Sequence, residues 1–466
     1  MTDFGESLPI HPALSLLTKQ ARAVQPSWNA LGFKWRKRVV SRMARIITGY
    51  ADQIAACITS CTGKNIVDAL ITEVVPSAMS ASWYARRARK FLKRRRIRAG
   101  NILFSFKRSY LLREPWGVIG IISPWNYPWS IPFQEIASAL MAGNAVILKM
   151  ASMVTPLVYW MKRVSLDAGV PKHVLQFVEL PGEEAGPAFL SSGVDKLFFT
   201  GSTIVGKKLM HLASRSLTPL CLELGGNNAM VVLENANLDR AANGALWAGL
   251  TGCGQSCGSV QRILVHRNVV VNFSSIISDK LARLRLGAET GFDLDIGRLA
   301  TRRQYETVSQ HLSDALDKGA HIVAQIGPDD PDKCIHPAVI LDRVTDNMKI
   351  MKEETFGPLM VIDTFNTTDE AIQKANSTSY GLAASVWSKD TGVAKKIATR
   401  LCAGSVMIND HLMNHGLPET HWGGSKLSGT GRTHGEAGFF EMTQTRVIVD
   451  DLLHPLPRAM WWYPYS

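Results

Sequence analysis

Two stretches of the sequence combine residue types that could carry out covalent chemistry. Thr251–Gly258 is a glycine-rich, uncharged run in which Cys257 lies between small residues. Glycine lets a backbone approach a ligand closely, so neighbouring side chains do not screen a thiol in such a run. Further upstream, Glu223 is a lone carboxylate in an apolar run that ends in two glycines. A thiol and a desolvated carboxylate are a nucleophile and a potential base.

Three other cysteines are better explained by packing than by chemistry. Cys253 either packs in the core or could pair with Cys257 under oxidising conditions, and a small buried thiol is the favoured interpretation. Cys57 and Cys61 are spaced for one face of a helix. Neither a histidine nor a second cysteine pair adjoins them, so packing is favoured over a metal pair. The sequence therefore predicts no metal site.

Length and composition limit the class of protein. A chain of 466 residues is too long for one hydrophobic core, and two or three domains are expected. Hydrophobic residues make up 46% and charged residues 20%, as in water-soluble proteins. No apolar run reaches the roughly 18 residues that span a bilayer, and residues 1–6 do not begin a secretory signal. Seven cysteines spread along the chain do not resemble a disulfide framework, so a reducing, cytoplasmic compartment is expected.

The net charge of +13 is concentrated in one segment, residues 86–98, which is rich in arginine and lysine. Such a run could bind nucleic acid, anionic lipid or an acidic partner. The favoured alternative is a solvated helix end that leads into a linker. No nucleic-acid-binding motif or aromatic stacking pattern accompanies the run, so nucleic-acid binding is not predicted.

Hydrophobic periodicity predicts an α/β fold. Residues 12–97 have the three- and four-residue spacing of helices, and residues 101–110 have the pattern of a strand. Short apolar strands then alternate with helices, at 118–122, 144–149, 174–178 and 196–200. This rhythm predicts a doubly wound parallel sheet, whose ligands bind beyond the carboxyl ends of its strands. The usual GxGxxG fingerprint after the first strand is missing, so the pattern alone leaves a dinucleotide site open.

Several ordered motifs resemble the NAD(P)-dependent aldehyde dehydrogenase superfamily over nearly the whole chain. Their order and spacing are far more specific than any one of them. They are Pro124–Pro128, Phe199–Ser202, Leu222–Gly226, Gly254–Cys257, Glu353–Pro358 and Gly423–Gly429.

The resemblance implies a Rossmann-type dinucleotide-binding domain, an α/β catalytic domain and an arm that bridges subunits. A homodimer or homotetramer is therefore expected. The implied boundaries are 1–97 and 115–225 for the dinucleotide-binding domain, 226–428 for the catalytic domain, 98–114 and 435–455 for the arm, and 456–466 for an aromatic tail.

By resemblance, Cys257 is the nucleophile that attacks a small-molecule aldehyde, and the amide of Asn126 stabilises the oxyanion that develops. Hydride transfer to NAD or NADP then leaves a thioester, and Glu223 activates the water that hydrolyses it to a carboxylic acid. A CoA-acylating enzyme is the related alternative, in which a thiol replaces water. A catalytically silent binding protein on the same fold is the alternative from another class. Such a protein is expected to have lost Cys257, Glu223 or Asn126, and all three are present.

The resemblance also places residues around the cofactor. Glu354 would hold the nicotinamide ribose. Other positions implied for the cofactor site are Trp125, Lys149, Ser152, Gly182, Gly186, Gly201, Ser202 and Phe356.

Three positions depart from the family pattern. Ser152 replaces a glutamate that is common in NAD-preferring relatives; without that carboxylate a 2′-phosphate is not repelled, so NADP is expected to be tolerated or preferred. Thr433 replaces a frequent glutamate, which argues against a second carboxylate in proton release. The tail Trp461–Tyr465 is unusually aromatic and, with the basic run 86–98, suggests a weak peripheral association with membranes. Packing of the tail on its own domain, or against the substrate funnel of a neighbouring subunit, is the alternative.

Overall fold

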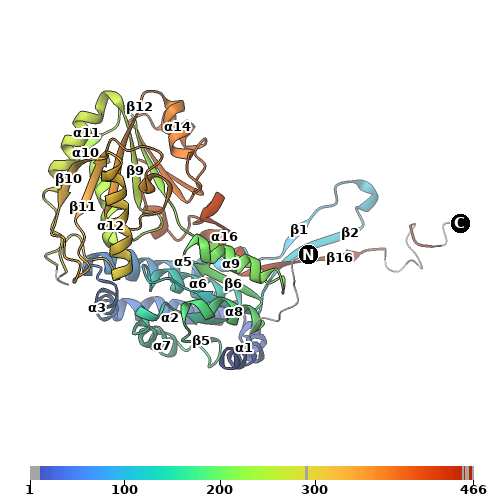
Figure 1. The fold of residues 1–466 in the computed structure, drawn as a ribbon. Coiled ribbons are helices and arrows are strands. Elements are labelled where there is room, and N and C mark those ends of the chain that lie inside the picture. The colour runs from blue at the N-terminus through green and yellow to red at the C-terminus, as the bar shows by residue number, and fades with distance from the viewer. Residues whose placement is uncertain (1–10, 289–291, 454–455, 457–460, 464–466) are drawn as a thin grey trace, which may run out of the picture.

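The computed structural model describes residues 11–288, 292–453, 456 and 461–463. Helices from the first part of the chain form a layer over one face of the first sheet (Figure 1), whereas Leu14 and Ala21 pack with residues 185–190 in the core under the opposite face. In α2, buried Val39, Val40, Met43 and Ile47 recur at helical spacing, which explains why this segment is a helix packed on one side. The first helices are α1 (Pro12–Ala30), α2 (Gly32–Gly49), α3 (Ala51–Thr62), α4 (Ile66–Ala69) and α5 (Val75–Phe91), with a π-helical turn at Leu70–Val74 between the last two.

The first sheet has six strands in the order β15-β7-β6-β3-β4-β5, and all of them are parallel except β15. The chain runs from β3 outwards to β5 and then returns to β6 on the other side of β3. The crevice between the carboxyl ends of β3 and β6 is therefore the topological switch point, where such sheets bind ligands. The strands are β3 (Val118–Ile122), β4 (Ala145–Lys149), β5 (Leu175–Phe177), β6 (Lys196–Thr200), β7 (Leu220–Glu223) and β15 (Gly429–Thr430).

Helices cover both faces of this sheet, as the alternating pattern predicts. Every residue of α6 is buried, and Gly143 ends this helix in the left-handed conformation. The helices are α6 (Ser130–Ala142), α7 (Leu157–Ala168), α8 (Gly182–Ser191) and α9 (Thr203–Ala213).

The second sheet has seven strands in the order β10-β11-β12-β9-β8-β13-β14, and only the β10–β11 pair is antiparallel. Successive residues of β8 face opposite sides: Met230 packs in the core under α10 to α12, and Val231 packs in the core under α14 and α15. The strands are β8 (Asn228–Val232), β9 (Val260–His266), β10 (His321–Ile326), β11 (Ala338–Asp342), β12 (Leu359–Phe365), β13 (Ala383–Trp387) and β14 (Ser405–Ile408). The helices are α10 (Leu238–Leu250), α11 (Val270–Leu281), α12 (Arg302–Asp317), α13 (Lys349–Lys352), α14 (Thr368–Asn376) and α15 (Thr391–Ala398).

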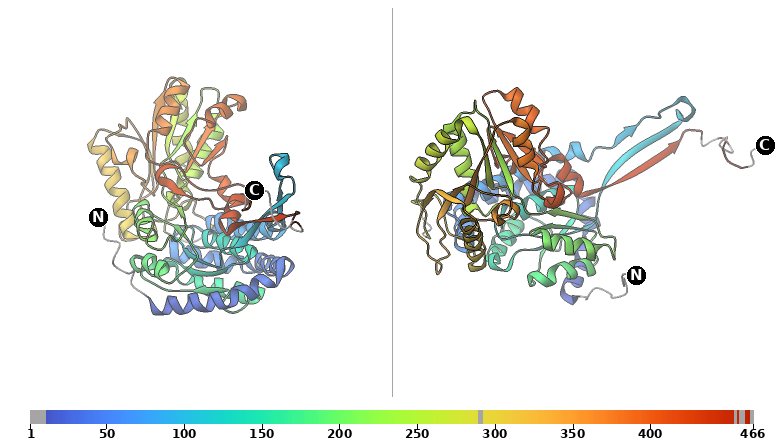
Figure 2. Two further views of the ribbon diagram at one scale, coloured as in Figure 1. Left: turned by 90° about the vertical axis from the view of Figure 1, so that its right-hand side faces the viewer. Right: turned by 45° about the horizontal axis from the view of Figure 1, so that its top comes forward.

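A three-stranded antiparallel ribbon of β1 (Arg95–Ile97), β2 (Lys107–Pro115) and β16 (Thr443–Asp451) projects from the body of the protein (Figure 2). The short helix α16 (Gly435–Glu441) leads into it. The sequence pattern differs from the structure here, because residues 95–97 form a strand and the strand expected from Asn101 begins at Lys107. The intervening residues, with a 3-10 turn at Ile102–Phe104, reverse the chain so that β1 and β2 can pair.

Every helix within the described ranges is too short or too polar to span a lipid bilayer.

Candidate active site

Cys257 lies in a tight turn between α10 and β9. Gly252, Cys253 and Gly254 all adopt the left-handed conformation, with φ between 59° and 70°. A Cβ on Gly254 would lie 2.3 Å from the carbonyl oxygen of Gly357, so only glycine fits there. The Asp68 carboxylate accepts the backbone N–H of Gly252 at 2.8 Å, which ties the turn to the first helical layer. Cys253 is buried in the core of the second sheet, as its packing interpretation predicts.

Asn126 reaches this turn from the loop that follows β3. Its side-chain Nδ2 donates to the carbonyl oxygen of Gln255 at 3.0 Å, and Gln255 in turn accepts the N–H of Ala300 through its own side chain. The amide of Asn126 has two hydrogens, and only one is used in the bond to Gln255. Asn126 and Cys257 line the same cleft.

A buried ion pair supports the Asn126 loop from behind. The ammonium of Lys64 lies 2.7 Å from a carboxylate oxygen of Glu73 and donates to the backbone carbonyl of Asn126 at 2.9 Å. Glu73, which is fully buried, also accepts the backbone N–H groups of Trp129 and Ser130 at 2.8 and 3.3 Å. A lysine at this depth is stable only because its charge is paired. The pair therefore fixes the backbone that carries the Asn126 amide.

Glu223 ends β7 at the same edge of the sheet. It is buried, and neither of its carboxylate oxygens has a hydrogen-bond partner among the described residues. Burial raises the pKa of Glu223 well above its ordinary value, against the opposing charge of Arg432. The backbone position is held from both sides, because Gly201 donates its N–H to the Glu223 carbonyl at 3.0 Å and Gly429 of β15 is its antiparallel partner.

A cleft of about 410 Å³ opens at the switch point, and Cys257, Asn126 and Glu223 all line it. Glu354 holds its position in the cleft by accepting the N–H of Gly226 at 2.9 Å. Burial raises the pKa of Glu354 to about 7. Five of the residues predicted to bind a cofactor line this cleft: Trp125, Gly201, Ser202, Glu354 and Phe356. The rings of Trp125 and Phe356 meet edge to face at 5.6 Å.

The other four predicted cofactor residues are not among those that line the cleft. Lys149 is the last residue of β4, and burial lowers the pKa of its ammonium group. Ser152 is exposed in the 3-10 turn that follows. Gly182 begins α8 beside open space, whereas a Cβ on Gly186 would lie 2.4 Å from Leu209 of α9. Gly186 thus allows the close packing of α8 against α9.

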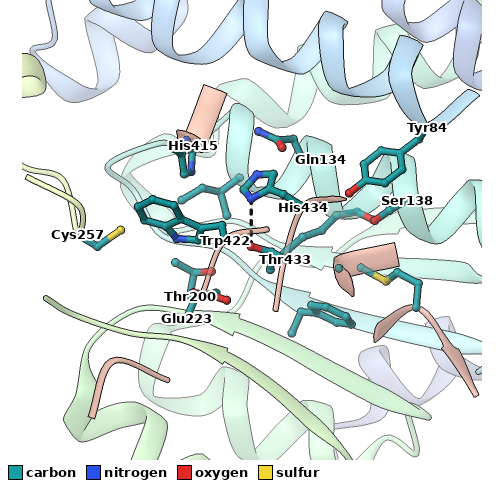
Figure 3. A pocket seen from close by; sticks show the side chains of 15 residues that line it. Tyr84, Gln134, Ser138, Thr200, Glu223, Cys257, His415, Trp422, Thr433 and His434 are labelled. Atoms are coloured by element: carbon teal, nitrogen blue, oxygen red, sulfur yellow. Dashed lines mark hydrogen bonds between the residues drawn. The ribbon is translucent and has the colours of Figure 1, made fainter. Parts of the chain in front are cut away.

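A second, smaller cavity meets the cleft at Thr200, Glu223 and Cys257 (Figure 3). Its free volume is about 20 Å³, enough for one water molecule. Aromatic rings and two histidines contribute to the lining, together with Glu135 from α6. Sequence reasoning missed Glu135 and the Lys64–Glu73 pair. A lone acid within the otherwise uncharged helix α6 was the available signal for Glu135.

The electrostatics around Cys257 favour a neutral thiol in the protein alone. Burial raises the pKa of Cys257 most, followed by the carboxylates of Glu354 and Glu223. The backbone N–H groups of Gly258 and Cys257 itself act in the opposite direction, because they hydrogen-bond to the sulfur. A nearby positive charge is thus needed to form a thiolate.

Residues 14–448 match the model of the aldehyde dehydrogenase family. The chain belongs to this family. It is 36% identical over 423 residues to a putative NADP⁺ succinate-semialdehyde dehydrogenase of Mycobacterium ulcerans, covering 89% of this chain and 81% of the relative. It is 34% identical to a 4,4'-diapolycopene aldehyde oxidase of a Methylomonas species, covering 97% and 83%. Its fold resembles that of a Bacillus cereus aldehyde dehydrogenase in complex with NAD⁺, with a TM-score of 0.89 and 29% identity over 94% of this chain and 88% of that one.

The aldehyde dehydrogenase fold expected from the motifs is confirmed, and the protein is an oxidoreductase that acts on aldehydes. The site brings together a thiol, an amide donor and an acid without a bonded partner. These three groups are suited to nucleophilic attack on a carbonyl, stabilisation of an oxyanion and activation of water.

Proposed function

We propose that this aldehyde dehydrogenase oxidises an aldehyde to a carboxylic acid through a thiohemiacetal and then a thioester on Cys257. Water activated by Glu223 hydrolyses the thioester. The observation that carries the proposal is the convergence of Cys257, Asn126 and Glu223 on one cleft at the switch point of the first sheet.

The Cys257 sulfur forms a bond to the aldehyde carbon, and the carbonyl oxygen gains the electron pair. The free hydrogen of the Asn126 amide and the backbone N–H of Cys257 are the donors for that oxyanion. Removing one such donor typically costs about 3 kcal/mol of barrier. Because Gln255 and the Lys64–Glu73 pair hold the Asn126 loop, this donor is in place before the substrate binds.

The cleft residues fit a nicotinamide dinucleotide. Glu354 offers carboxylate oxygens to ribose hydroxyls, and the N-terminus of α9, after Gly201 and Ser202, offers a positive dipole to phosphates. When bound, the oxidised nicotinamide supplies the hydride acceptor and a positive charge that favours the thiolate. Lys149, Gly182 and Gly186 are assigned to the adenosine end.

Glu223 acts on the thioester after oxidation. In its ionised form it takes a proton from water, and the resulting hydroxide adds to the thioester carbon. The carbon–sulfur bond then breaks, which releases the carboxylic acid and returns the Cys257 thiolate. A carboxylate whose pKa is raised by burial is a stronger base than one in water. The second cavity has room for that water beside both Glu223 and Cys257.

NADP is proposed to be accepted as well as NAD, and preferred if the two differ. Ser152 follows Lys149 after β4 and is exposed, so no carboxylate stands there to repel a 2′-phosphate. The mycobacterial relative is named as NADP⁺-dependent, and the Bacillus cereus structure contains NAD⁺.

The test follows absorbance at 340 nm with a panel of aldehydes and either cofactor. We expect Cys257→Ala to abolish turnover, and the exposed-cysteine control Cys402→Ala to retain it. Glu223→Gln is expected to give one equivalent of reduced cofactor per site and then stop, because its thioester is not hydrolysed. Full turnover by Cys257→Ala would refute the proposal. Release of acyl-CoA, with no acid formed in the absence of CoA, would support the CoA-acylating alternative.

We also propose the domain division implied by the motifs, with 1–97 and 115–225 binding the dinucleotide, 226–428 catalytic, and 98–114 with 435–455 as a subunit-bridging arm. On its outer strand β16, Val447, Ile448 and Val449 are 47–58% exposed, which gives the strand apolar surface on both faces that suits burial against a second copy. The proposed assembly is a cytoplasmic homodimer or homotetramer. Light scattering should give two or four chains per particle, and a monomer would contradict this.

Peripheral contact with membranes is proposed through the tip of the same arm. Ile102 is 89% exposed there, and Trp461 of the tail stacks on Phe106 at 5.8 Å. Trp461 also packs near Phe104 at 5.5 Å, which joins the tail to the tip. Exposed apolar and aromatic groups beside the basic run 86–98 suit an anionic bilayer surface.

Sedimentation with vesicles tests this contact. Full-length protein should pellet with phosphatidylserine-containing vesicles and remain in solution with purely zwitterionic ones. A chain ending at Pro457 should bind less, and equal binding by both chains would remove the tail from the proposal. Pro464 and Tyr465 of the predicted aromatic tail lie outside the described residues.

A further inference from the structure

The space beyond Cys257 determines which aldehydes the protein can accept. Cys257 adjoins two cavities, and the larger one carries the residues suited to the cofactor. If the proposed function holds, the chain attached to the aldehyde carbon must extend away from that cleft, into the second cavity (Figure 3). Its free volume holds about one water molecule, so a chain that enters must displace that water and push the lining side chains apart, and it then contacts them directly.

The lining of the second cavity offers no positive charge. Ile131, Phe198, Trp422 and Met442 present apolar surface. Among the described residues that line the cavity, none is lysine or arginine, whereas two are acids, Glu135 and Glu223. The remaining lining residues are Tyr84, Gln134, Ser138, Thr200, Cys257, His415, Thr433, His434 and Gly438.

Both histidines of the lining are neutral at physiological pH. Burial lowers the pKa of His415 to about 4, and the nearby charge of Lys64 acts in the same direction. Burial lowers the pKa of His434 well below its ordinary value. The two rings pack against each other at 5.1 Å and are held by aromatic neighbours. Neither ring supplies a cation for an anionic substrate.

Two cations near the cavity, buried Lys64 and half-buried Arg432, are already engaged. Lys64 lies 4.0 Å above the Tyr127 ring, but its ammonium is paired with Glu73 and bonded to the Asn126 carbonyl. Arg432 donates to the carbonyl oxygens of Gly424 and Gly431 at 2.9 and 2.6 Å. A substrate anion would have to displace one of these bonds.

We infer that the aldehyde is uncharged away from its carbonyl group and carries an apolar chain, and that anionic semialdehydes are poor substrates. This inference rests on the proposed function. A carboxylate in the second cavity would be desolvated beside Glu135 and Glu223 with no cation to pair with, and unpaired buried charge is strongly disfavoured. An apolar chain meets no such cost. This chain thus differs in substrate charge from the relatives named for succinate semialdehyde.

The test compares succinate semialdehyde with its methyl ester, which has the same backbone but no charge. We expect kcat/KM to be at least about 100-fold higher for the ester. A cation introduced by Gln134→Arg should narrow this ratio by about 10-fold or more, and Gln134→Met is the control that removes the amide without adding charge. The Gln134→Met control should keep kcat/KM higher for the ester than for succinate semialdehyde.

The outcomes separate this inference from the proposed function. If the protein oxidises neither compound and no other aldehyde, both the proposed function and this inference are wrong. If both are oxidised and succinate semialdehyde is equal or better, the inference is wrong and the proposed function stands. If Gln134→Arg fails to fold, the comparison of Glu135→Gln with wild type at pH 9 replaces it, because Glu135 is ionised at that pH and removing its charge should narrow the ratio.

Discussion

The buried Lys64–Glu73 pair makes a prediction whose size can be worked out from its contacts. Lys64→Met removes the ammonium that lies 2.7 Å from Glu73 and leaves that carboxylate, which is fully buried, without a counter-ion. The two N–H groups of Trp129 and Ser130 still bond to it, but they carry no net charge. Breaking a buried ion pair from one side costs about 3–5 kcal/mol. For a chain of 466 residues, we expect the melting temperature to fall by roughly 3–5 °C.

The same substitution should reduce kcat, because the Asn126 carbonyl loses its donor at 2.9 Å and its loop relaxes. Loss of one oxyanion donor, about 100- to 1,000-fold in kcat, is the upper bound for this effect. Lys395→Met, on the exposed face of α15, is the matched control and should change stability by less than about 0.5 kcal/mol. Differential scanning fluorimetry and steady-state kinetics measure the two effects.

A double-mutant cycle with Glu73→Gln tests whether the cost of Lys64→Met comes from the unpaired charge of Glu73. Glutamine retains an acceptor for the two N–H groups but has no charge, so the double variant should be about 2 kcal/mol or more stable than Lys64→Met alone. Its kcat should stay low, since the Asn126 carbonyl still lacks its donor. If Lys64→Met melts like wild type, or if Glu73→Gln adds nothing in that background, the pair does not support the loop as argued.

Three further substitutions test other parts of the site. Burial raises the pKa of Glu135 to about 8 from 4.5, so the folded protein holds a proton that the unfolded chain loses and stability should fall as pH rises between these values. Glu135→Gln should remove the part of that loss that falls between pH 6 and pH 9, about 3 kcal/mol, as measured by urea titrations at those two pH values; an unchanged pH dependence would contradict this. Ser152→Glu should shift the ratio of kcat/KM for NADP to that for NAD by about 10-fold or more towards NAD, and an unchanged ratio would place the 2′-phosphate elsewhere. Gly254→Ala should lower stability by more than about 3 kcal/mol and abolish activity, since its Cβ would meet the Gly357 carbonyl, whereas Gly319→Ala, at a φ of 93° with open space around it, should cost only about 1 kcal/mol.

Sequence patterns predicted the parallel sheets because their physical signal is local. Val118–Ile122 and Ala145–Leu148 are continuous apolar runs, and every residue in both is buried. Arg95–Ile97 has no such signal, since its three residues are exposed and form a strand only because β2 lies beside them. Such a segment becomes a strand only through pairing with another part of the chain, and its own hydrophobic periodicity does not reveal this.

The residues of the candidate site likewise divide into those with a local sequence signal and those that depend on distant partners. Cys257 and Glu223 could be identified from short stretches of sequence. Cys257 lies in a glycine-rich run, and Glu223 is the only acid in an apolar run; both patterns are uncommon. Lys64 and Glu73 were missed, since each looks like an ordinary charge on a helical surface until the fold buries them together. Their partners, the Asn126 carbonyl and two backbone N–H groups, are main-chain atoms that no sequence pattern displays.

The pairing of Gly429 with Glu223 has a consequence for biosynthesis. The acid is synthesised first, and the strand that closes its edge of the sheet follows about two hundred residues later. Residue 429 must also be glycine, because a Cβ there would lie 2.0 Å from the Leu222 carbonyl. A ribosome-bound chain thus carries its sulfur nucleophile before the neighbouring acid is locked in place, and a nonsense mutation anywhere before this strand leaves that edge open.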